Sequence, residues 1–363
     1  MGFYYVRPTN GSNGNAGTSF AAAWQTTQYA LDNCHAGDYI YLCAEAVEQT
    51  SSQIDIDTKT GNINSWITLE GRDGVDGTTP AQYTIQRTGS SGLLMVANTF
   101  NVEYFNFKNI TFDGNSIATT CFTNTASNSV VAFHFANCRF TGSAGIGLQH
   151  SCASNQNPWV FTNCQFDNNS SDGYSGFSVY GTAYLQSCVF NDNGRYGANV
   201  ADSSHGTVNC IFYGNTSDGL YLDTNSDTPI IDHCTFYNNS GNGININTTS
   251  CEGWIISSCA FVSNGGYGIN KLATKESESV DYNLFYNNTS GHCNLVSDAN
   301  INDGTVGWNN QTTDPSFTNA AGNDFTPSSV SSPLVGNAPN NGTIGALGVV
   351  TASSGGGTVA HAI

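Results

Sequence analysis

A nine-residue pattern of apolar and polar positions recurs six times along the middle of the chain, as in FANCRFTGS (135–143) and ISSCAFVSN (256–264). Every copy places a Phe two residues after a Cys, and successive cysteines are separated by 22 to 26 residues. Alternate residues of a strand face the same side, so the Cys and the Phe of one copy point inward together. A period of this length, built from strand residues and Gly/Asn-rich turns, predicts a stacked solenoid.

Stacking the copies at about 4.8 Å turns each repeated residue into an interior ladder. The cysteine ladder comprises Cys138, Cys164, Cys188, Cys210, Cys234 and Cys259. Three residues after each Phe, the asparagine ladder comprises Asn169, Asn193, Asn215, Asn239 and Asn264, with Asn115 and Asn288 in degenerate flanking copies and Ser143 as an exception. An inward Asn at a sharp turn can bond the backbone of its own coil and the amides above and below it.

A second strand follows each of these turns and begins at a Gly, as in GIGL (145–148) and GLYL (219–222). We expect this Gly to supply an unusual backbone dihedral after the turn. The first and third residues after it are mostly apolar and are expected to face inward. The whole pattern predicts an all-β fold, a single-stranded right-handed parallel β-helix.

The flanking sequence predicts a cap at each end of this coil. The chain is expected to form an N-terminal cap, a coil, a C-terminal cap and a Gly-rich tail, at residues 1–48, 49–308, 309–348 and 349–363. In the N-terminal cap, Thr18 and Ser19 are expected to begin an amphipathic helix over 20–33, between a first strand and a returning one. Each cap would cover an end of the coil whose open edge invites pairing with other chains. The tail is expected to anchor the chain to a neighbouring molecule.

Composition narrows the classes of function. The chain carries 9 Lys and Arg against 27 Asp and Glu, a formal net charge of −18. This balance argues against nucleic-acid binding, which requires clustered cations, and against binding to anionic membrane surfaces. No apolar run reaches the ~20 residues that span a bilayer. The N-terminus has no basic segment followed by an apolar core, so no secretory signal is expected.

The chain has 12 cysteines. The six ladder cysteines are expected to be reduced, because a buried thiol serves as a small apolar filler. The other six could form disulfides: Cys34, Cys43, Cys121, Cys152, Cys251 and Cys293. No spacing of Cys and His indicates zinc, and no metal or cofactor is expected. Reduced, stacked thiols suit a protein that folds in a cytosol.

Candidate catalytic groups are few. Arg195 lies in the turn DNGRYG, and Asp202 and Asp223 follow the second strand of successive rungs. Their carboxylates could lie several ångströms apart, as the pair of a glycoside hydrolase must. Asp in Gly/Asn-rich turns is mainly a turn former, however, and that interpretation is favoured. Arg139, with no acid opposite it on either adjacent rung, is interpreted as a solvated surface charge.

Outward aromatic residues indicate a contact surface. Tyr221 lies between two inward leucines, Tyr196 and Tyr267 each precede the Gly of a second strand, and Trp254 lies five residues before a ladder Cys. Aromatic faces beside Asn and Asp suit sugars, which stack on rings and bond to amides. Tyr and Trp are equally typical of protein–protein interfaces, so glycan contact and partner contact remain alternatives.

With these motifs, nearly the whole chain resembles the pectate-lyase-like right-handed parallel β-helix superfamily. The Asn series matches the asparagine ladder of that architecture, and the opening YYVRPTNGSNGNAGTSFAAAWQTTQYALDNCHAGDYIYL resembles the first elements of β-helix proteins from bacteria and phages. The closing DPSF…IGALG is similar to the last turns of the same group. The superfamily includes polysaccharide lyases and hydrolases, phage tailspikes, adhesins and virion proteins, so the resemblance implies fold more than activity. The hydrolase pattern of close aspartates with an Arg-x-Lys pair is absent.

The function expected first is that of a bacteriophage virion structural protein, either a capsid-attached decoration protein or a tail spike or fibre. Such a chain would be assembled in the host cytoplasm as a homotrimer, would contact other virion proteins, and would bind host surface polysaccharide. The scarcity of cationic groups, the reduced thiols and the absence of an export signal favour this interpretation over catalysis. The alternatives are an extracellular polysaccharide lyase or glycoside hydrolase, and a bacterial surface adhesin.

Overall fold

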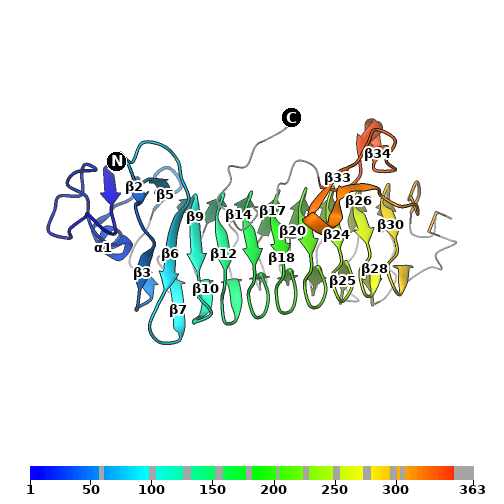
Figure 1. The fold of residues 1–363 in the computed structure, drawn as a ribbon, viewed down its shortest axis with the longest axis horizontal. Helices are drawn as coiled ribbons and strands as arrows, with labels where there is room; N and C mark the ends of the chain where they lie inside the picture. The colour runs from blue at the N-terminus through cyan, green and yellow to red at the C-terminus, as the bar shows by residue number, and fades with distance from the viewer. Residues whose placement is uncertain are drawn as a thin grey trace. The chain divides into compact units, whose positions relative to one another are not determined.

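The computed structural model shows a chain that divides into two compact units, Met1–Ala183 and Tyr184–Ile363 (Figure 1). The described residues are 1–56, 61–97, 104–125, 132–151, 158–176, 182–201, 204–223, 229–247, 254–272, 279–294, 301–302 and 307–346. The tail that was expected to serve as an anchor, 349–363, lies outside them. Within these ranges, no helix is long and apolar enough to cross a membrane.

In the first unit, each turn of the chain contributes one strand to each of three parallel sheets. The first sheet runs β1 (Phe3–Val6), β2 (Tyr39–Ala44), β5 (Ile67–Asp73), β8 (Phe105–Lys108), β11 (Phe133–Ala136) and β14 (Pro158–Thr162). The second runs β3 (Glu48–Thr50), β6 (Tyr83–Arg87), β9 (Ile110–Asp113), β12 (Arg139–Thr141) and β15 (Gln165–Asp167). The third runs β4 (Ile54–Asp55), β7 (Gly92–Val96), β10 (Ala118–Asn124), β13 (Ile146–His150) and β16 (Tyr174–Gly176).

The second unit repeats this arrangement of three parallel sheets. Its first sheet runs β17 (Thr182–Gln186), β20 (Ser204–Val208), β23 (Ile230–Asp232), β26 (Ile255–Ser257) and β29 (Ser279–Asp281). Its second runs β18 (Val189–Asn191), β21 (Ile211–Tyr213), β24 (Thr235–Tyr237), β27 (Ala260–Val262) and β30 (Leu284–Tyr286). Its third runs β19 (Ala198–Val200), β22 (Leu220–Leu222), β25 (Ile244–Ile246), β28 (Tyr267–Lys271) and β31 (Gly291–Cys293). One strand per sheet per turn confirms the predicted parallel β-helix.

The ladder phenylalanines form the apolar interior. In the second unit, the ring centres of Phe190 and Phe212 lie 4.6 Å apart and those of Phe212 and Phe236 lie 4.8 Å apart, with the planes nearly parallel. All three side chains are fully buried. The ring separation equals the spacing of neighbouring strands, so the stack follows directly from the register of the sheet.

The predicted asparagine ladder is present as a chain of hydrogen bonds. The Nδ2 of Asn215 donates to the Oδ1 of Asn239 at 2.8 Å and to the carbonyl of Phe190 at 3.0 Å. The Oδ1 of Asn215 accepts from the backbone N–H of Asn193 at 3.2 Å and from its Nδ2 at 3.0 Å. Asn239 and Asn264 repeat the pattern. Each inward amide therefore satisfies backbone groups at the corner of two rungs.

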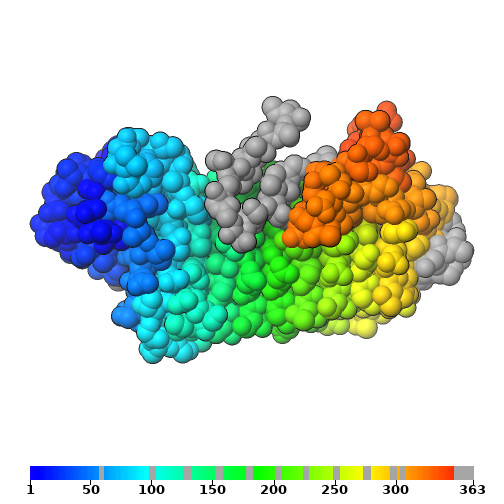
Figure 2. Space-filling model, in the orientation of Figure 1, coloured from blue at the N-terminus to red at the C-terminus, as the bar shows by residue number. Residues whose placement is uncertain are grey.

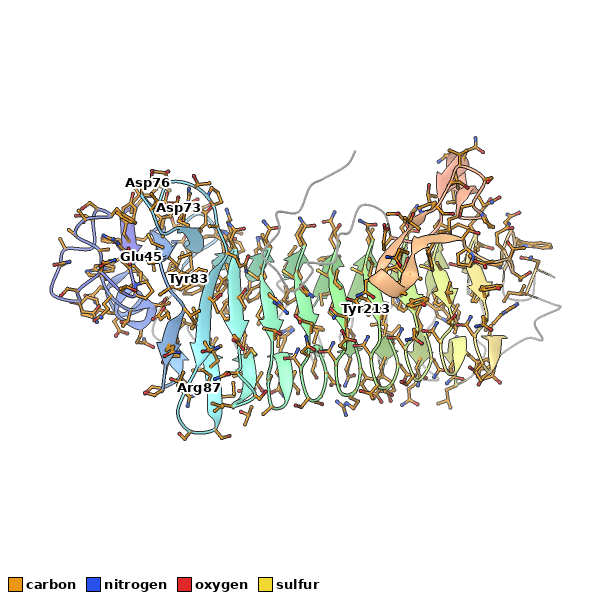
Figure 3. All side chains as sticks on the ribbon, viewed as in Figure 1. Glu45, Asp73, Asp76, Tyr83, Arg87 and Tyr213 are labelled. Carbon is orange, nitrogen blue, oxygen red and sulfur yellow. The ribbon has the colours of Figure 1, made fainter. Side chains whose placement is uncertain are left out.

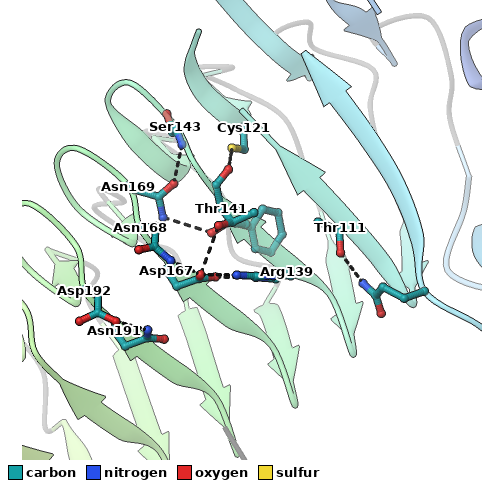
Figure 4. A network of polar contacts seen from close by, with 12 residues as sticks. Thr111, Cys121, Arg139, Thr141, Ser143, Asp167, Asn168, Asn169, Asn191 and Asp192 are labelled. Carbon is teal, nitrogen blue, oxygen red and sulfur yellow. Dashed lines mark hydrogen bonds and ion pairs between the residues drawn. The ribbon is translucent and has the colours of Figure 1, made fainter. Parts of the chain in front are cut away.

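The ladder has two exceptions in the first unit. Ser143 occupies an Asn position, and its hydroxyl donates to the carbonyl of Ala118 while its N–H donates to the Oδ1 of Asn169 (Figure 4). Asn115 is exposed, with a positive φ of 51°, rather than inward. The inward placement expected for Asn115 is wrong, because this residue forms the corner itself.

The glycines that open the second strands serve packing rather than backbone dihedral freedom. At the corners of the coil, positive φ values fall directly before the ladder Cys and the ladder Asn, as at Asn209 (56°) and Gly214 (66°). At Gly219, a Cβ would lie 2.8 Å from the carbonyl oxygen of Gly243 and 2.9 Å from the ring of Phe236. The expected dihedral role is therefore wrong: no side chain fits between the rungs at this position.

The cysteine ladder is bonded like the asparagine ladder. The N–H of Cys210 donates to the sulfur of Cys234, and the thiol of Cys210 donates to the carbonyl of Leu185, both at 3.4 Å. On the rung after Cys259, Asn283 takes the place of the ladder Cys. The N–H of Cys259 donates to the Oδ1 of Asn283 at 2.8 Å. Free thiols are found at Cys138, Cys210, Cys234 and Cys259 of the ladder, and at Cys43 and Cys121. Cys152 and Cys251 lie outside the described residues.

The N-terminal helix is shorter than expected. It spans α1 (Thr27–Asn33), and the side chain of Thr26 caps it by accepting from the N–H of Tyr29. The preceding residues are held by the first strand instead, because the N–H of Trp24 donates to the carbonyl of Tyr5 at 2.9 Å. The helix predicted over 20–33 is therefore wrong over 20–26, about its first two turns, although Leu31 is fully buried as its spacing requires.

The C-terminal residues fold back over the second unit. Two antiparallel hairpins and two short 3₁₀ turns make up the segment 316–346, called here the strap: β32 (Phe317–Asn319), η2 (Ala320–Gly322), β33 (Asp324–Pro327), β34 (Val335–Ala338), η3 (Pro339–Asn341) and β35 (Gly342–Thr343). Figure 2 shows the strap, in orange, against the coil of this unit.

The strap covers the outer face of the second sheet. Phe325 packs between Tyr213 and Tyr237, with ring centres 5.5 Å and 5.0 Å away (Tyr213 is labelled in Figure 3). The outward column beneath it is apolar, and Ile211 and Ala260 are almost fully buried there. The expectation that this segment covers the end of the coil is wrong, because the apolar outward column of the second sheet needs a cover of its own.

Candidate functional site

The outer face of the third sheet in the second unit is polar and uncovered by the strap. Its central column is Asn199, Tyr221, Asn245 and Asn270, paired in register on β19, β22, β25 and β28. Leu220 and Leu222 are fully buried on either side of Tyr221, so the intervening residue must face outward. Three amides and one phenol therefore follow one another along this column at the spacing of the rungs, about 4.8 Å.

Two of the predicted aromatic contacts meet on this face. The rings of Tyr196 and Tyr221 are stacked, with centres 4.6 Å apart and planes 14° from parallel. The guanidinium carbon of Arg195 lies 4.8 Å from the centre of the Tyr196 ring. Both tyrosines are half-buried, and Arg195 is exposed. The turn that carries Arg195 and Tyr196 therefore places a guanidinium group and an aromatic ring beside Tyr221 on the neighbouring strand.

Tyr221 is the centre of a charged neighbourhood. Partial burial, followed by the carboxylates of Asp223 and Asp218, raises the pKa of its phenol, while a hydrogen bond with Asn247 and the charge of Arg195 oppose that rise. A phenol with a raised pKa stays protonated at neutral pH. Tyr221 can therefore donate and accept hydrogen bonds at this surface, but it is poorly suited to act as a general base.

The amides beside Tyr221 are organised by a buried carboxylate. Asp218 is 4% exposed, and its Oδ1 accepts from the N–H and the Nδ2 of Asn242 while its Oδ2 accepts from Asn245 at 3.0 Å. The Oδ1 of Asn245 in turn accepts from Asn270 at 3.1 Å. Asp218 thus acts as a structural acceptor that orients amide groups on the face.

Asn199 carries an acceptor without a partner. Its side chain is 6% exposed, and its Oδ1 accepts no hydrogen bond from the part of the chain that the structure describes. It lies directly opposite Tyr221 in the pairing of β19 and β22. Buried acceptors are normally satisfied by the protein, by water or by a ligand, because an unsatisfied one is costly.

Tyr267 lies on the same face but apart from the pair. The register places it in one column with Tyr196, Asp218 and Asn242. It is three rungs from Tyr196, or roughly 14 Å at the usual strand spacing. Its N–H donates to the Oδ1 of Asn242 at 2.8 Å. Tyr267 could therefore contact a ligand that extends along several rungs.

Trp254 does not belong to this surface. It is fully buried, and the Nζ of Lys271 lies 4.6 Å from the centre of its ring. The residues that follow alternate, with Ile255 42% exposed and Ile256 fully buried. The outward placement of Trp254 is wrong, because its position five residues before the ladder Cys falls in the inward phase of the strand.

The candidate catalytic residues are only partly brought together. Arg195 and Asp223 both act on the phenol of Tyr221, and Asp223 is exposed just after β22. Asp202 lies outside the described residues, so the proposed carboxylate pair does too. Among the residues that are described, no group of three or more His, Cys, Asp and Glu side chains is placed to hold a metal ion.

Arg139 is at the surface of the first unit, 36% exposed, but it is paired with the buried carboxylate of Asp167, so its interpretation as a solvated charge without a partner is wrong (Figure 4). Its Nε donates to Asp167 Oδ1 at 2.8 Å and its Nη2 donates to Oδ2 at 2.5 Å. Asp167 is 1% exposed and also accepts from Thr141 and Asn168. Thr111 and Gln165 lie directly opposite Arg139 on the two adjacent rungs and carry no charge, but a long Arg side chain reaches diagonally to the carboxylate two residues beyond Gln165.

Residues 124–290 match the family described as right handed beta helix region. Among solved structures, the chain is similar to pectate lyase Pel9A, at 16% identity over 78% of this chain and 79% of that one, with a TM-score of 0.53. It is similar to the A-module of mannuronan C-5 epimerase AlgE4 from Azotobacter vinelandii, at 12% identity over 85% and 97% of the two chains, with a TM-score of 0.51.

A protein of Geobacillus virus E2, ORF18, is also similar, at 15% identity over 78% of this chain and 56% of that one, with a TM-score of 0.49. No curated protein matches the sequence. At such identities a structural likeness shows the fold alone. The right-handed parallel β-helix, and the resemblance to its pectate-lyase-like superfamily, are therefore confirmed as statements of fold.

Proposed function

From the right-handed parallel β-helix fold that this chain shares with the pectate-lyase-like superfamily, we propose that it is a bacteriophage virion structural protein that binds host surface glycans. It stands on the particle exterior as a capsid decoration protein or as part of a tail spike or fibre. The glycan lies on the third-sheet face of the second unit. This assignment treats the protein as a binding module rather than an enzyme.

One observation carries the glycan part of this proposal: the stacked, half-buried rings of Tyr196 and Tyr221 lie on an outer face whose central column also carries amide side chains. A sugar presents apolar C–H faces that stack on rings and hydroxyls that donate to amide oxygens. Asn245 and Asn270 extend the polar column by two rungs. The face therefore suits several consecutive sugars of a polymer, and the net charge of −18 favours a neutral one over a polyanion.

The virion part of the proposal is supported by the free thiols inside the coil and by the ion pairing of three arginines. Free thiols in the cysteine ladder suit a chain that folds and assembles in a cytoplasm. Arg139 is held by Asp167, and Arg7 and Arg72 are held by Glu45 and Glu70. These described arginines are ion-paired, so they are poor candidates for the strong base that a polysaccharide lyase needs.

The glycan arm is tested by measuring binding of the purified protein to immobilised surface polysaccharides from candidate host bacteria. Tyr221→Ala should weaken binding by about tenfold, the loss expected when one ring–sugar contact of about 1–1.5 kcal/mol is removed. Tyr221→Phe, which keeps the ring, should retain most of the binding. The control is Tyr39→Ala, which removes a half-buried outward tyrosine of β2 in the first unit. Equal binding by wild type and Tyr221→Ala to every polysaccharide would contradict the assignment of this face.

The location arm is immunogold electron microscopy of phage particles with an antibody against this chain. Gold on heads or tails supports a virion component and separates a decoration protein from a host-recognition protein. Gold that is absent from particles but present in the culture medium would overturn the virion assignment. Cleavage of a polysaccharide by wild type, lost in Asp223→Asn, would establish the lyase or hydrolase alternative.

A further inference from the structure

A branched chain of hydrogen bonds runs along the outer face of the third sheet in the second unit and begins at the buried side chain of Asp218. The Oδ1 of Asp218 accepts from the backbone N–H and the Nδ2 of Asn242, at 2.6 Å and 2.8 Å. Its Oδ2 accepts from the Nδ2 of Asn245 at 3.0 Å. A carboxylate has no proton to donate, so every group that faces it must be a donor. Asp218 therefore fixes which end of each neighbouring amide points toward it.

The first branch ends at a donor that cannot be reversed. Because the Nδ2 of Asn242 is used on Asp218, the Oδ1 of Asn242 points the other way, where it accepts the backbone N–H of Tyr267 at 2.8 Å. A backbone N–H can only donate, so the amide of Asn242 is held in this orientation from both sides. The N–H of Tyr267 alone would keep Asn242 in place if another amide stood where Asp218 is.

The second branch ends at the surface. Asn245 donates to Asp218, so its Oδ1 is turned toward the next rung, where it accepts from the Nδ2 of Asn270 at 3.1 Å. The Oδ1 of Asn270 is the remaining end of this branch. No described residue donates to that oxygen, and Asn270 is only half-buried, which leaves the atom open to solvent. The branch that begins at a buried carboxylate thus ends in an open hydrogen-bond acceptor.

The next rung does not use this acceptor. Asn294 follows β31 there, and both ends of its amide bond the backbone of Lys271: its Oδ1 accepts the N–H at 2.8 Å, and its Nδ2 donates to the carbonyl at 2.7 Å. The open Oδ1 of Asn270 lies two rungs from Tyr221, or roughly 10 Å along the central column. A polymer that stacks on Tyr221 and follows the column therefore reaches this oxygen with a later sugar.

We propose that Asp218 makes this face select glycans with free hydroxyl groups over glycans in which those hydroxyls are O-acetylated. The inference rests on the glycan binding proposed above, and Asp218 acts in it as a positioning residue that touches no ligand. A hydroxyl can donate to the Oδ1 of Asn270, whereas an ester offers only acceptor atoms, which an amide oxygen cannot bond. A chain of amides that ends on a carboxylate also polarises the carbonyls within it, which strengthens the acceptor at its open end.

Asp218→Asn should reverse the second branch with little change in size. Tyr267 still holds Asn242, whose N–H groups require the oxygen of the new amide, so the new amide turns its own NH₂ toward Asn245. Asn245 then accepts through its Oδ1 and donates to the Oδ1 of Asn270, which leaves the Nδ2 of Asn270 at the surface. An N–H can donate to a hydroxyl oxygen and to an ester carbonyl alike. The variant should therefore bind both forms of the glycan about equally.

The test is isothermal titration calorimetry of the full chain with short oligosaccharides cut from a neutral surface polysaccharide that wild type binds. They are used with free hydroxyls and after chemical O-acetylation. Wild type should bind the free form about tenfold more tightly, the value of one hydrogen bond. Asp218→Asn, and Asn270→Ala, which removes the acceptor itself, should bind both forms about equally. The control is Asp172→Asn, the same change at a buried residue of the first unit that also lies three residues after a ladder Asn, and it should keep the wild-type preference.

Each other outcome overturns the inference in a recognisable way. Equal binding of the two forms by wild type overturns the selectivity and leaves the glycan-binding proposal standing. A preference that persists in Asp218→Asn and Asn270→Ala also overturns it, because acetyl groups would then be excluded by their size alone. If wild type binds no polysaccharide, both proposals fall. Asn270→Ala changes a half-buried side chain at the end of the branch, so it decides the question even if Asp218→Asn does not fold.

Discussion

Cysteine and asparagine perform the same task at the corners of this coil. The thiol of Cys210 donates to a carbonyl of the preceding rung, and its sulfur accepts the backbone N–H of Cys188. The amide of Asn283 makes the same two kinds of bond: its Nδ2 donates to the carbonyl of Ile256, and its Oδ1 accepts the backbone N–H of Cys259. The sulfur contacts are longer, at 3.4 Å against 2.8–2.9 Å for the amide. A thiol is thus a weaker but smaller partner than an amide, which explains why the ladder Cys can sit deep in an apolar interior.

Asn215 offers a direct test of the asparagine ladder. Replacing it by Ala leaves the carbonyl of Phe190 and the backbone N–H of Asn193 without their partners inside the coil. We expect Asn215→Ala to lower the free energy of unfolding by about 1–3 kcal/mol, the cost of unsatisfied buried groups. Chemical denaturation monitored by circular dichroism measures the change. The exposed Asn64 supplies the control variant, Asn64→Ala, and an equal effect of both substitutions would contradict the ladder's role.

His150 should make the protein sensitive to acid. It is fully buried against Trp159, with ring centres 4.1 Å apart, and burial lowers its pKa from 6.5 to about 3. Between these two values the unfolded chain binds a proton that the folded chain does not. Stability contributed by the neutral ring is therefore complete above pH 6.5 and is lost as the pH falls towards 3, by about 1.4 kcal/mol per pH unit.

His150→Phe keeps an aromatic ring on Trp159 and removes the proton site. The free energy of unfolding of this variant should fall less steeply between pH 6.5 and 3 than that of wild type. Urea unfolding at a series of pH values measures both slopes. Asn64→Phe, which changes an exposed residue that does not titrate, should leave the wild-type slope unchanged. Parallel slopes for wild type and His150→Phe would show that the buried ring is protonated in the folded state.

At the scale of elements, the strap determines which outward residues belong to the core. Val189 and Ile211 face outward from the second sheet, yet they are 5% and 2% exposed because Phe325 and Ala346 pack on them. The strap is also tied by two hydrogen bonds, from the N–H of Ala346 to Thr235 and from that of Gly345 to Ser258. Among the described residues it is therefore a separate layer, held to the coil by two clusters of side chains and these two hydrogen bonds.

Phe325→Ala should loosen the strap more than the coil. Truncating this buried ring removes its contacts with Tyr213 and Tyr237, at a cost of about 3–5 kcal/mol to the attached state. The amides of Gly345 and Ala346 should then exchange their hydrogens much faster, while the amides of the asparagine ladder keep their protection. Hydrogen exchange followed by mass spectrometry separates the two. Val330→Ala is the control, and unchanged exchange at 345–346 in Phe325→Ala would contradict this account.

At the scale of the whole molecule, charge and apolar surface are kept apart. Negative charge dominates the composition, and three of the five arginines, Arg7, Arg72 and Arg139, each bind a carboxylate. The apolar outward positions of the second sheet in the second unit are covered by the strap. The strap thus removes apolar surface from water, while the net negative charge remains to repel polyanions.

The sequence by itself determined the coil. A Cys, a Phe and an Asn at fixed offsets, recurring every 22 to 26 residues, imply a strand, a corner and a second strand in each rung. Each of these features depends on residues close together in the chain and on stacking with an identical neighbour, so the repeat alone predicts it. The outward phase of Tyr196, Tyr221 and Tyr267 follows for the same reason.

Only the tertiary structure decided what lies against the coil. Ala346 bonds to Thr235, 111 residues earlier, and no local pattern in the strap indicates that it covers a sheet face rather than an end. The stacking of Tyr196 on Tyr221, like the diagonal pairing of Arg139 with Asp167, depends on rotamers and on register between rungs. Contacts of this kind are set by three-dimensional packing, which spacing along one chain does not specify.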